Sequence, residues 1–419
     1  MVRDGNGTLK VAVVGAGISG LGAAYLLSRA HDVEVFERAG SAGGHTHTVE
    51  HRVNGRVLLL DTGFLVLNEP NYPLLLRLFG ELGVRTQGSE MSFSVSCGSC
   101  GLEYSGRRPF AQPRNAFRPP FLALLREVGR WLRTARRSLD EADYERYTLA
   151  RYVAERGYSQ RFRDHFLAPL TSALWSTAPE RALDFPAAYA IRFFDHHGML
   201  GFGRFRWRAV AGGSRTYVDA LRALLGERLH LGLGARSLRR DPHGVELALE
   251  NGETRRFDKV VVATHADQAL ALLADPSTEE QRVLGAFGYT VNDTVLHTDA
   301  SLLPRSPAAR ASWNFHAGRV PSGKPSITYY LNRLQRLEEE RDYCVTLNRG
   351  ADVDPELVLA RLRYEHPLYT LESLAAQPRL AALSGRRHTL YAGAHLGNGF
   401  HEDGLASGVA AAAALGVDW

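Results

Sequence analysis

The sequence is poor in sulfur and in long apolar runs, and each shortage excludes a class of protein. Its 419 residues include only three cysteines, which argues against a framework of disulfides. No apolar stretch reaches the roughly 20 residues that a helix needs to cross a bilayer. The first ten residues lack the charged and then apolar pattern of a secretion signal. We therefore expect a globular, cytoplasmic protein with enough core for two or three domains.

The sequence also lacks the spacings that are typical of metal sites. Cys97 and Cys100 form a Cys-Gly-Ser-Cys motif, but no second pair of ligands follows at the spacing of a structural zinc site. The histidines are scattered and form no HExxH pattern. Gly98 and Gly101 instead favour a hairpin turn between two strands. The sequence therefore predicts no metal site, and a redox role of the two cysteines remains an alternative.

What the sequence does contain, from Lys10 to Glu37, is a strand, a glycine turn, a helix and a second strand. Gly15 permits the tight turn, Gly17 lets a diphosphate approach the backbone, and Gly20 lets the helix pack on the strand. The N-terminus of that helix attracts the diphosphate. Glu37 lies 22 residues after Gly15, where an acid binds a ribose hydroxyl. The segment predicts dinucleotide binding.

Three further features favour FAD over NAD. A glycine pair at 43–44 follows the ribose acid, where it can wrap the pyrophosphate. The strand that ends at residues 263–264 places small side chains beside a cofactor. Gly393 ends another strand, and a helix predicted over 404–415 directs its N-terminus at the flavin ring, where it stabilises negative charge. No second glycine motif lies in a strand–turn–helix context, so we expect no separate NAD(P)H domain.

The residues expected to hold FAD come from these loops and strand ends. They are Gly15, Gly17, Ile18, Ser19, Gly20, Glu37, Arg38, Gly43, Gly44, His45, Thr46, Gly63, Phe64, Arg236, Ala263, Thr264, Gly393, His401, Gly404 and Leu405. His47 and His401 are the leading candidates for a catalytic general base, because both lie in loops expected beside the flavin. Glu402 and Asp403 come next, although acids at that place also cap a helix.

The predicted fold class is α/β with α+β insertions, and the cofactor pieces are separated in the sequence. Residues 1–85, 205–285 and 385–419 are predicted to form a discontinuous FAD-binding domain. Residues 86–109 and 286–384 form a substrate domain with a mixed sheet, and 110–204 form a helical subdomain. Local patterns predict helices over Pro73–Leu82 and Pro355–Tyr364, strands over Leu229–Leu238 and Arg256–Ala263, and a hairpin that turns at Asn54-Gly55.

Positive charge is concentrated in one stretch of the chain. Nine arginines lie between residues 107 and 137, and Glu127 is the only acid among them. Apolar residues recur there at a spacing of three and four, so a helix with an arginine-rich face is expected. That face is either simply solvated or rests on an anionic membrane, with Phe121 and Trp131 entering the interface. No nucleic-acid-binding motif accompanies the charge, so nucleic acid is not expected as a partner.

Several stretches of the chain resemble the flavin-containing amine oxidoreductase superfamily, beginning with Gly15–Gly20, Glu37 and the glycine pair. Within it, the chain is similar to bacterial FAD-dependent oxidoreductases encoded beside cyclopropane-fatty-acyl-phospholipid synthases. This likeness is carried by AGGHTHTV (42–49), DTGFLVLNEPNYP (61–73), WRAVAGGSRTYV (207–218) and GNGFHEDGLASG (397–408). The superfamily often has arginine after the glycine pair, where this chain has His45.

The resemblance implies a Rossmann-type FAD-binding domain of the amine-oxidase-like fold. It also implies hydride transfer from a modified or unsaturated fatty acyl chain, held in phospholipid, to flavin N5, with reoxidation by dioxygen or another acceptor. Alternatives are a double-bond isomerase, an amine or polyprenoid oxidase, and a non-catalytic flavoprotein subunit. Such a protein is expected in the cytoplasm or on the inner face of the membrane.

Two groups of side chains are candidates for the substrate side. His196 and His197 form a second histidine site in the helical subdomain. Aromatic residues are expected to line a long apolar cavity, although each is individually as typical of plain core. They are Trp175, Phe185, Phe193, Phe194, Trp207, Trp313, Phe315, Tyr329 and Tyr330.

Overall fold

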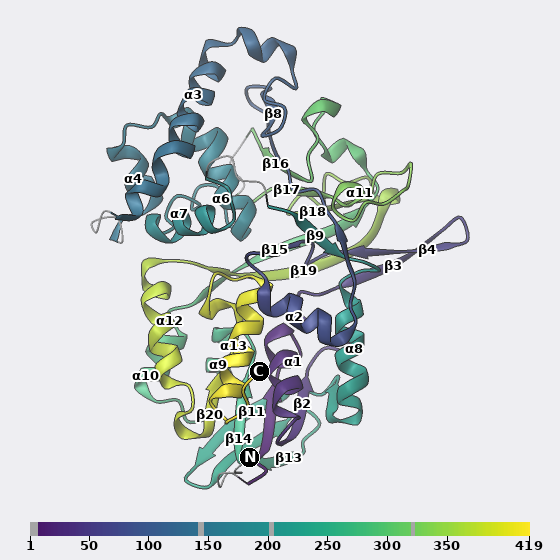
Figure 1. Cartoon of the computed structure of the whole chain (residues 1–419), viewed down its shortest axis with the longest axis vertical. Coiled ribbons are helices and arrows are strands. Elements are labelled where there is room, and N and C mark those ends of the chain that lie inside the picture. The colour runs from purple at the N-terminus through teal and green to yellow at the C-terminus, as the bar shows by residue number, and fades with distance from the viewer. Residues whose placement is uncertain (1–6, 141–145, 201–204, 320–322) are drawn as a thin grey trace.

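The computed structural model describes the chain except for residues 1–6, 141–145, 201–204 and 320–322. A parallel sheet with its covering helices forms one end of the molecule, and both labelled termini lie there (Figure 1). A mixed sheet crosses the middle, and a block of helices lies at the other end. These elements match the predicted fold class, α/β with α+β insertions.

Five parallel strands form the cofactor-side sheet, in the order β10-β2-β1-β14-β20. Their bounds are Leu229–Leu231, Asp32–Glu37, Lys10–Val14, Lys259–Val262 and Thr389–Tyr391. Valine fills the central strands because helices or strands cover both faces of the sheet. The first, middle and last segments of the chain thus meet side by side in one sheet.

Alternate residues of each strand serve different faces of this sheet. Val11 and Val13 pack in one cluster with helices α1 (Ile18–Leu27), α8 (Arg215–Leu225) and α13 (His401–Ala413). Ala12 and Val14 pack in another. The elements of that second cluster are β11 (Ala235–Asp241), β12 (Gly244–Leu249), β13 (Thr254–Phe257), α9 (Ala266–Leu272), α10 (Thr278–Leu284) and α12 (Leu371–Leu383).

Seven strands form the second sheet, which is antiparallel except for the parallel pair β16–β7. In spatial order they are β19 (Val358–Leu368), β15 (Gly288–His297), β18 (Cys344–Leu347), β17 (Ile327–Tyr330), β16 (Trp313–Ala317), β7 (Phe93–Cys97) and β8 (Glu103–Ser105). Segments far apart in the sequence therefore share this sheet as well.

The helix predicted over Pro355–Tyr364 is wrong. Pro355–Leu357 form a single 3₁₀ turn, and β19 follows at once. Ten residues of β19 pair with β15, from His297↔Val358 to Gly288↔Leu368. The apolar spacing of these residues is compatible with a helix or a strand. They form a strand because they pair with β15, which is distant in the sequence.

Three predicted boundaries also need correction. The last helix begins at His401, not at residue 404. The strand predicted over Arg256–Ala263 is broken at Asp258, whose carboxylate accepts a hydrogen bond from the Lys10 amide at 2.7 Å. The strand predicted over Leu229–Leu238 is two strands, β10 and β11, which belong to different sheets.

Local turn signals predicted other elements correctly. Helix α2 spans Pro73–Leu82 and ends at Gly83, which has a φ of 69°. Asn54 and Gly55 connect β3 (Thr48–Val53) to β4 (Arg56–Asp61), both with positive φ. The two cysteines at 97 and 100 bracket the turn between β7 and β8, as expected. Glycine and asparagine adopt left-handed conformations at low cost, so these signals are reliable.

The helical block packs around one tryptophan of α3 (Pro119–Thr134). Trp131 is fully buried against Tyr152, Tyr158 and Phe194, and Phe121 is buried as well. Its other helices are α4 (Leu149–Glu155), α5 (Gln160–Phe162), α6 (Ala168–Trp175) and α7 (Ala187–His196). The prediction that Phe121 and Trp131 enter a membrane is therefore wrong, because the apolar face of α3 serves the core.

Candidate functional site

A cavity of about 840 Å³ lies where the parallel sheet, the mixed sheet and the helical block meet. Cavities that hold cofactors and small ligands have volumes of this order. Its wall begins at the strand ends and glycine loops of the parallel sheet. From there it continues over β19 to the apolar side chains of the mixed sheet.

The glycine turn after β1 forms one end of this cavity. Gly15 has a φ of 102°, and a Cβ there would lie 2.7 Å from the Ala263 carbonyl oxygen. Gly17 lines the cavity, and a Cβ on it would meet no atom within 4 Å. Gly17 is also the N-cap of α1, and no side chain caps the helix. The free amides and the helix dipole thus face a space that suits a diphosphate.

Glu37, at the end of β2, also lines the cavity. Its carboxylate accepts hydrogen bonds from the amides of Ala16 at 2.7 Å and Ala39 at 2.9 Å. These bonds hold the acid beside the glycine turn, where a dinucleotide ribose lies in such folds. The second glycine pair is close by, since Gly43 pairs with Gly17 in an isolated bridge.

Most of the predicted cofactor residues line the cavity, and four lie behind it. The four are Gly20, Thr46, Gly404 and Leu405. A Cβ on Gly20 would lie 1.9 Å from the Gly15 carbonyl oxygen, and Leu405 packs in the space that Gly22 leaves. These residues set the close approach of α1 to the sheet and to α13, so their role is to shape the wall.

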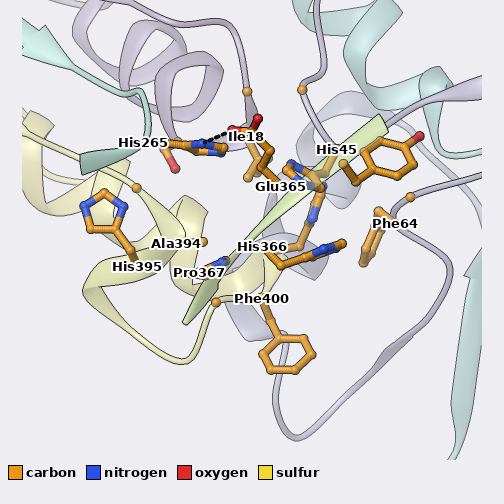
Figure 2. Close-up of a pocket in the computed structure, with 18 of the residues that line it drawn as sticks. Ile18, His45, Phe64, His265, Glu365, His366, Pro367, Ala394, His395 and Phe400 are labelled. Atoms are coloured by element: carbon orange, nitrogen blue, oxygen red, sulfur yellow. Dashed lines mark ion pairs between the residues drawn. The ribbon is translucent and has the colours of Figure 1, made fainter. Parts of the chain in front are cut away.

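Imidazole and phenol rings form the middle of the cavity wall (Figure 2). The His45 ring lies 5.3 Å from both Tyr364 and His366, measured between ring centroids. His265 stacks on Tyr289 at 4.3 Å, and its Nδ1 lies 3.5 Å from a Glu365 carboxylate oxygen. The His45 Nε2 is buried and has no hydrogen-bond partner among the described residues. This atom is free to meet a bound group.

Burial keeps these histidines neutral. Desolvation and, to a smaller extent, the neighbouring His265 lower the pKa of His45 to about 4. Desolvation likewise lowers the pKa of His366 to about 3 and of His401 to about 3. At neutral pH, the middle of the cavity therefore carries no histidine charge.

The two predicted general bases occupy different positions. His401 lines the cavity, stacks on Phe64 at 4.0 Å, and places Nε2 2.7 Å from Thr46 Oγ1 and 3.0 Å from Tyr217 Oη. These contacts tie the second glycine loop to α8 and α13, which favours a positioning role. His47 lies outside the cavity lining, with its Nδ1 3.0 Å from Thr62 Oγ1. Its placement does not support a catalytic role.

The acids that follow His401 are structural. Glu402 accepts hydrogen bonds from the amides of Leu74 at 2.7 Å and Leu75 at 2.9 Å, at the start of α2. Asp403 accepts from the Phe400 amide and so caps its own helix. Both acids therefore cap helices, which was the alternative to a catalytic role.

The far end of the cavity is apolar. Its lining there includes Met91, Leu174, Met199, Leu347 and four of the predicted aromatic residues, Phe193, Trp207, Trp313 and Tyr329. The other five aromatic residues, Trp175, Phe185, Phe194, Phe315 and Tyr330, do not line it. Of the second histidine site, His197 lines the cavity and stacks on Phe193 at 3.8 Å, whereas His196 does not line it.

Sequence reasoning missed the β19 part of the wall. Tyr364, Glu365, His366 and Pro367 all line the cavity. The sequence pattern puts Tyr364 at the end of a predicted helix and predicts no element for the other three, so it does not bring them near the glycine loops. Predicting residues 358–368 as a strand that pairs with β15 would have placed these residues in the wall.

Comparisons with known proteins agree with this geometry. The family model described as flavin containing amine oxidoreductase matches residues 18–416. A search of curated protein sequences gave no match. Among solved structures, putrescine oxidase bound to putrescine matches with a TM-score of 0.68 and 14% identity, covering 97% of this chain and 98% of that one.

Two other solved structures have the same fold. Cyclohexylamine oxidase from Brevibacterium oxydans IH-35A matches with a TM-score of 0.68 and 17% identity. A fatty acid isomerase from P. acnes that produces CLA matches with a TM-score of 0.66 and 17% identity. Each covers 97% of this chain and 98% of its own. The fold is therefore shared by proteins with different activities.

Proposed function

The chain belongs to the flavin-containing amine oxidoreductase family and is an FAD-dependent oxidoreductase, and from that premise we propose that its substrate is a modified or unsaturated fatty acyl chain in phospholipid. The observation that carries this proposal is the apolar far end of the cavity. Within the described lining, the carboxylates are those of Glu37 and Glu365. Glu37 lies at the glycine turn and Glu365 lies beside His265 in the middle of the wall, so neither belongs to the apolar end.

An amine substrate would need different surroundings. A protonated amine loses its hydration on entering such a cavity, and the cost is large because no carboxylate among the residues described at the apolar end replaces the water. The aromatic rings there replace it only where they enclose the ammonium group. The neutral histidines and the side chains of Met91, Leu174 and Leu347 suit a chain of methylene groups instead. Each buried methylene contributes roughly 0.8 kcal/mol to binding.

The residues fit FAD at the other end. The uncapped α1 N-terminus and Gly17 would hold the diphosphate, Glu37 the ribose, and the partnerless His45 Nε2 a polar atom of the cofactor. FAD, when bound, supplies a two-electron acceptor for a C–H bond. The chain's own residues then orient the acyl chain and exclude water from the reacting end.

Anaerobic flavin bleaching tests the proposal. Vesicles of phospholipid with methylated or unsaturated chains should reduce the flavin of the purified protein. Saturated phospholipid, putrescine and cyclohexylamine serve as matched controls and should not reduce it. Bleaching by an amine but by no lipid would contradict the acyl substrate.

One rival follows from the fatty acid isomerase among the structural neighbours. A double-bond isomerase acts without a net electron acceptor, so it consumes no dioxygen. Double-bond migration in the recovered lipid, without oxygen uptake or lasting flavin bleaching, would favour this rival over dehydrogenation.

We also propose that the arginine-rich segment 107–137 rests on an anionic membrane, through residues other than those first predicted. None of the helices in the described part of the chain has the length and apolar character to cross a bilayer. Phe117 is 87% exposed, Phe110 48% and Leu122 43%, which is unusual for large apolar side chains. Around them, Arg108, Arg118, Arg126, Arg133 and Arg137 make no ion pair with any described residue. Apolar tips among unpaired cations are typical of interfacial contact.

A further inference from the structure

A second cluster of reactive side chains lies away from the cavity lining, at the β7–β8 hairpin. Cys97 ends β7, Cys100 lies in the turn, and His165 comes from a π-helical turn, η4 (Arg163–Leu167), between α5 and α6. The two sulfurs and a ring nitrogen of His165 all lie within 4.8 Å of one another. We propose that these three residues bind a zinc ion.

The spacing of the ligand atoms matches tetrahedral zinc. With Zn–S of about 2.3 Å and Zn–N of about 2.0–2.1 Å, a tetrahedral site places sulfur and nitrogen roughly 3.6 Å apart. The Cys100 Sγ and His165 Nε2 are 3.5 Å apart. Two thiolates and a neutral imidazole balance the charge of Zn²⁺. Cys100 is exposed, so water can complete the fourth position.

The hairpin backbone is held in place for this role. The Cys97 amide donates to the Leu102 carbonyl, and the Gly101 amide donates to the Cys97 carbonyl, both at 2.9 Å. Gly101 has a φ of 65°, which permits the tight return of the chain. The Gly98 amide donates to the Ala317 carbonyl at 2.8 Å, which fixes the turn to the end of β16.

The π-helical turn brings the third ligand to the hairpin. Such a turn inserts an extra residue into a helix, and π-turns often occur at functional sites. Tyr104 Oη of β8 donates to the His165 carbonyl at 2.6 Å, so the hairpin and the turn are fastened together. The His165 Nδ1 is buried and has no hydrogen-bond partner in the described part of the chain, so no competing bond turns the ring away from the sulfurs.

A zinc site here departs from the prediction of no metal site. The sequence motif lacked a nearby partner, and His165 lies 65 residues beyond Cys100. The ion would join the edge of the mixed sheet to the start of α6. Leu174, near the end of α6, lines the apolar end of the cavity. The metal would thus hold one wall of that cavity in position.

Metal analysis of the flavin-loaded full chain tests the site. Protein purified without chelator should carry about one zinc ion per chain. Cobalt(II) added after zinc removal should give sulfur-to-cobalt charge-transfer absorption and tetrahedral d–d bands. C100S and H165A should lose bound zinc and these bands, whereas C344A, which alters the cysteine buried in β18, should keep both.

A second measurement does not depend on variants. Alkylation of the native protein, followed by peptide mass analysis, should modify Cys97 and Cys100 only after a chelator is added. Equal alkylation with and without chelator, together with protein that binds neither zinc nor cobalt, would overturn the proposal. A Cys97–Cys100 disulfide in protein prepared without oxidant would overturn it as well.

Discussion

At the residue scale, Gly17 is a position where a substitution should change FAD affinity without changing the fold. Gly17 lines the cavity and an ideal Cβ there meets no protein atom within 4 Å, so a larger side chain takes up cavity space. Gly17→Val should therefore lower FAD affinity about tenfold or more by occupying cofactor space, with the fold unchanged. Flavin absorbance per chain after gel filtration, with circular dichroism, measures this.

Gly40→Val is the matched control. A Cβ at Gly40 also meets nothing within 4 Å, but Gly40 does not line the cavity. This variant should keep its flavin. Full flavin retention by Gly17→Val would contradict the placement of the diphosphate at α1.

Buried histidines make stability depend on pH. Desolvation lowers the pKa of His297 to about 4 and of His395 to about 3, below the 6.5 of an exposed histidine. Between pH 6.5 and 4, the unfolded chain binds protons that the folded chain refuses, so stability falls as the pH falls. Each such histidine should cost on the order of 1–2 kcal/mol of unfolding free energy between pH 7 and 5.

Urea denaturation at a series of pH values measures this effect. His297→Asn should show a shallower loss between pH 7 and 5 than the wild-type protein does. Asp61 changes the stability in the opposite direction. Burial raises its pKa to about 6, so its protonation stabilises the folded protein as the pH falls. A stability that does not change between pH 7 and 5 would contradict the neutral state of these histidines.

At the scale of elements, one carboxylate joins the two helices α13 and α2. Glu402 accepts hydrogen bonds from two free amides at the start of α2. Glu402→Ala should cost about 1–2 kcal/mol of unfolding free energy, because it removes a charged cap from a helix that packs beside the cofactor loops. Glu372→Ala, in the first turn of α12, is the control and should cost less.

The proposed membrane contact belongs to α3 and the turn before it. Replacing Arg126, Arg133 and Arg137 with glutamine should weaken binding to anionic liposomes by about 1 kcal/mol per residue. Lowering the salt concentration should strengthen binding of the wild-type protein but not of the variant, because the variant lacks the screened charges. Phe117→Ser should weaken binding further through lost apolar contact. Sedimentation with neutral and anionic liposomes measures both effects, and unchanged binding in all variants would sink the proposal.

Elements whose signals are local could be predicted, and those that depend on distant partners could not. The glycine turn with Glu37, the hairpin at Asn54-Gly55 and helix α2 each depend on residues next to one another. Strand β19 depends on β15, about 70 residues away, and was predicted as a helix. The sequence predicts the apolar face of α3. It does not predict whether that face packs in the core or contacts a membrane.

The same distinction holds for the site. The residues at the glycine loops and strand ends were found because their chemistry follows from the turn itself. His265, Glu365 and His366 were missed, because only the fold brings β19 to the start of α9. The contacts of His401 could not be predicted for the same reason, since Thr46 and Tyr217 reach it from segments 184 to 355 residues away.

At the scale of the whole molecule, the cavity joins two environments with different demands. Its cofactor end offers amides and a carboxylate, and its far end offers methyl, methylene and aromatic groups. Leu174→Asp should lower the rate of flavin reduction by acyl phospholipid about tenfold or more, with flavin content unchanged, because it places a charge among apolar side chains. Leu174→Met, which conserves volume, should react at nearly the wild-type rate. Equal rates for both variants would contradict the apolar substrate end.

The cavity's dependence on three separate segments bears on how the protein is made. Glu37 is synthesised long before Gly393 and His401, and the wall needs all of them. At about 5–20 residues per second, roughly 20–70 s of translation separates Glu37 from His401. Over that interval the nascent chain exposes an incomplete site. Flavin can be enclosed only after α13 leaves the ribosome, so cellular FAD supply acts on a chain that already contains all three segments.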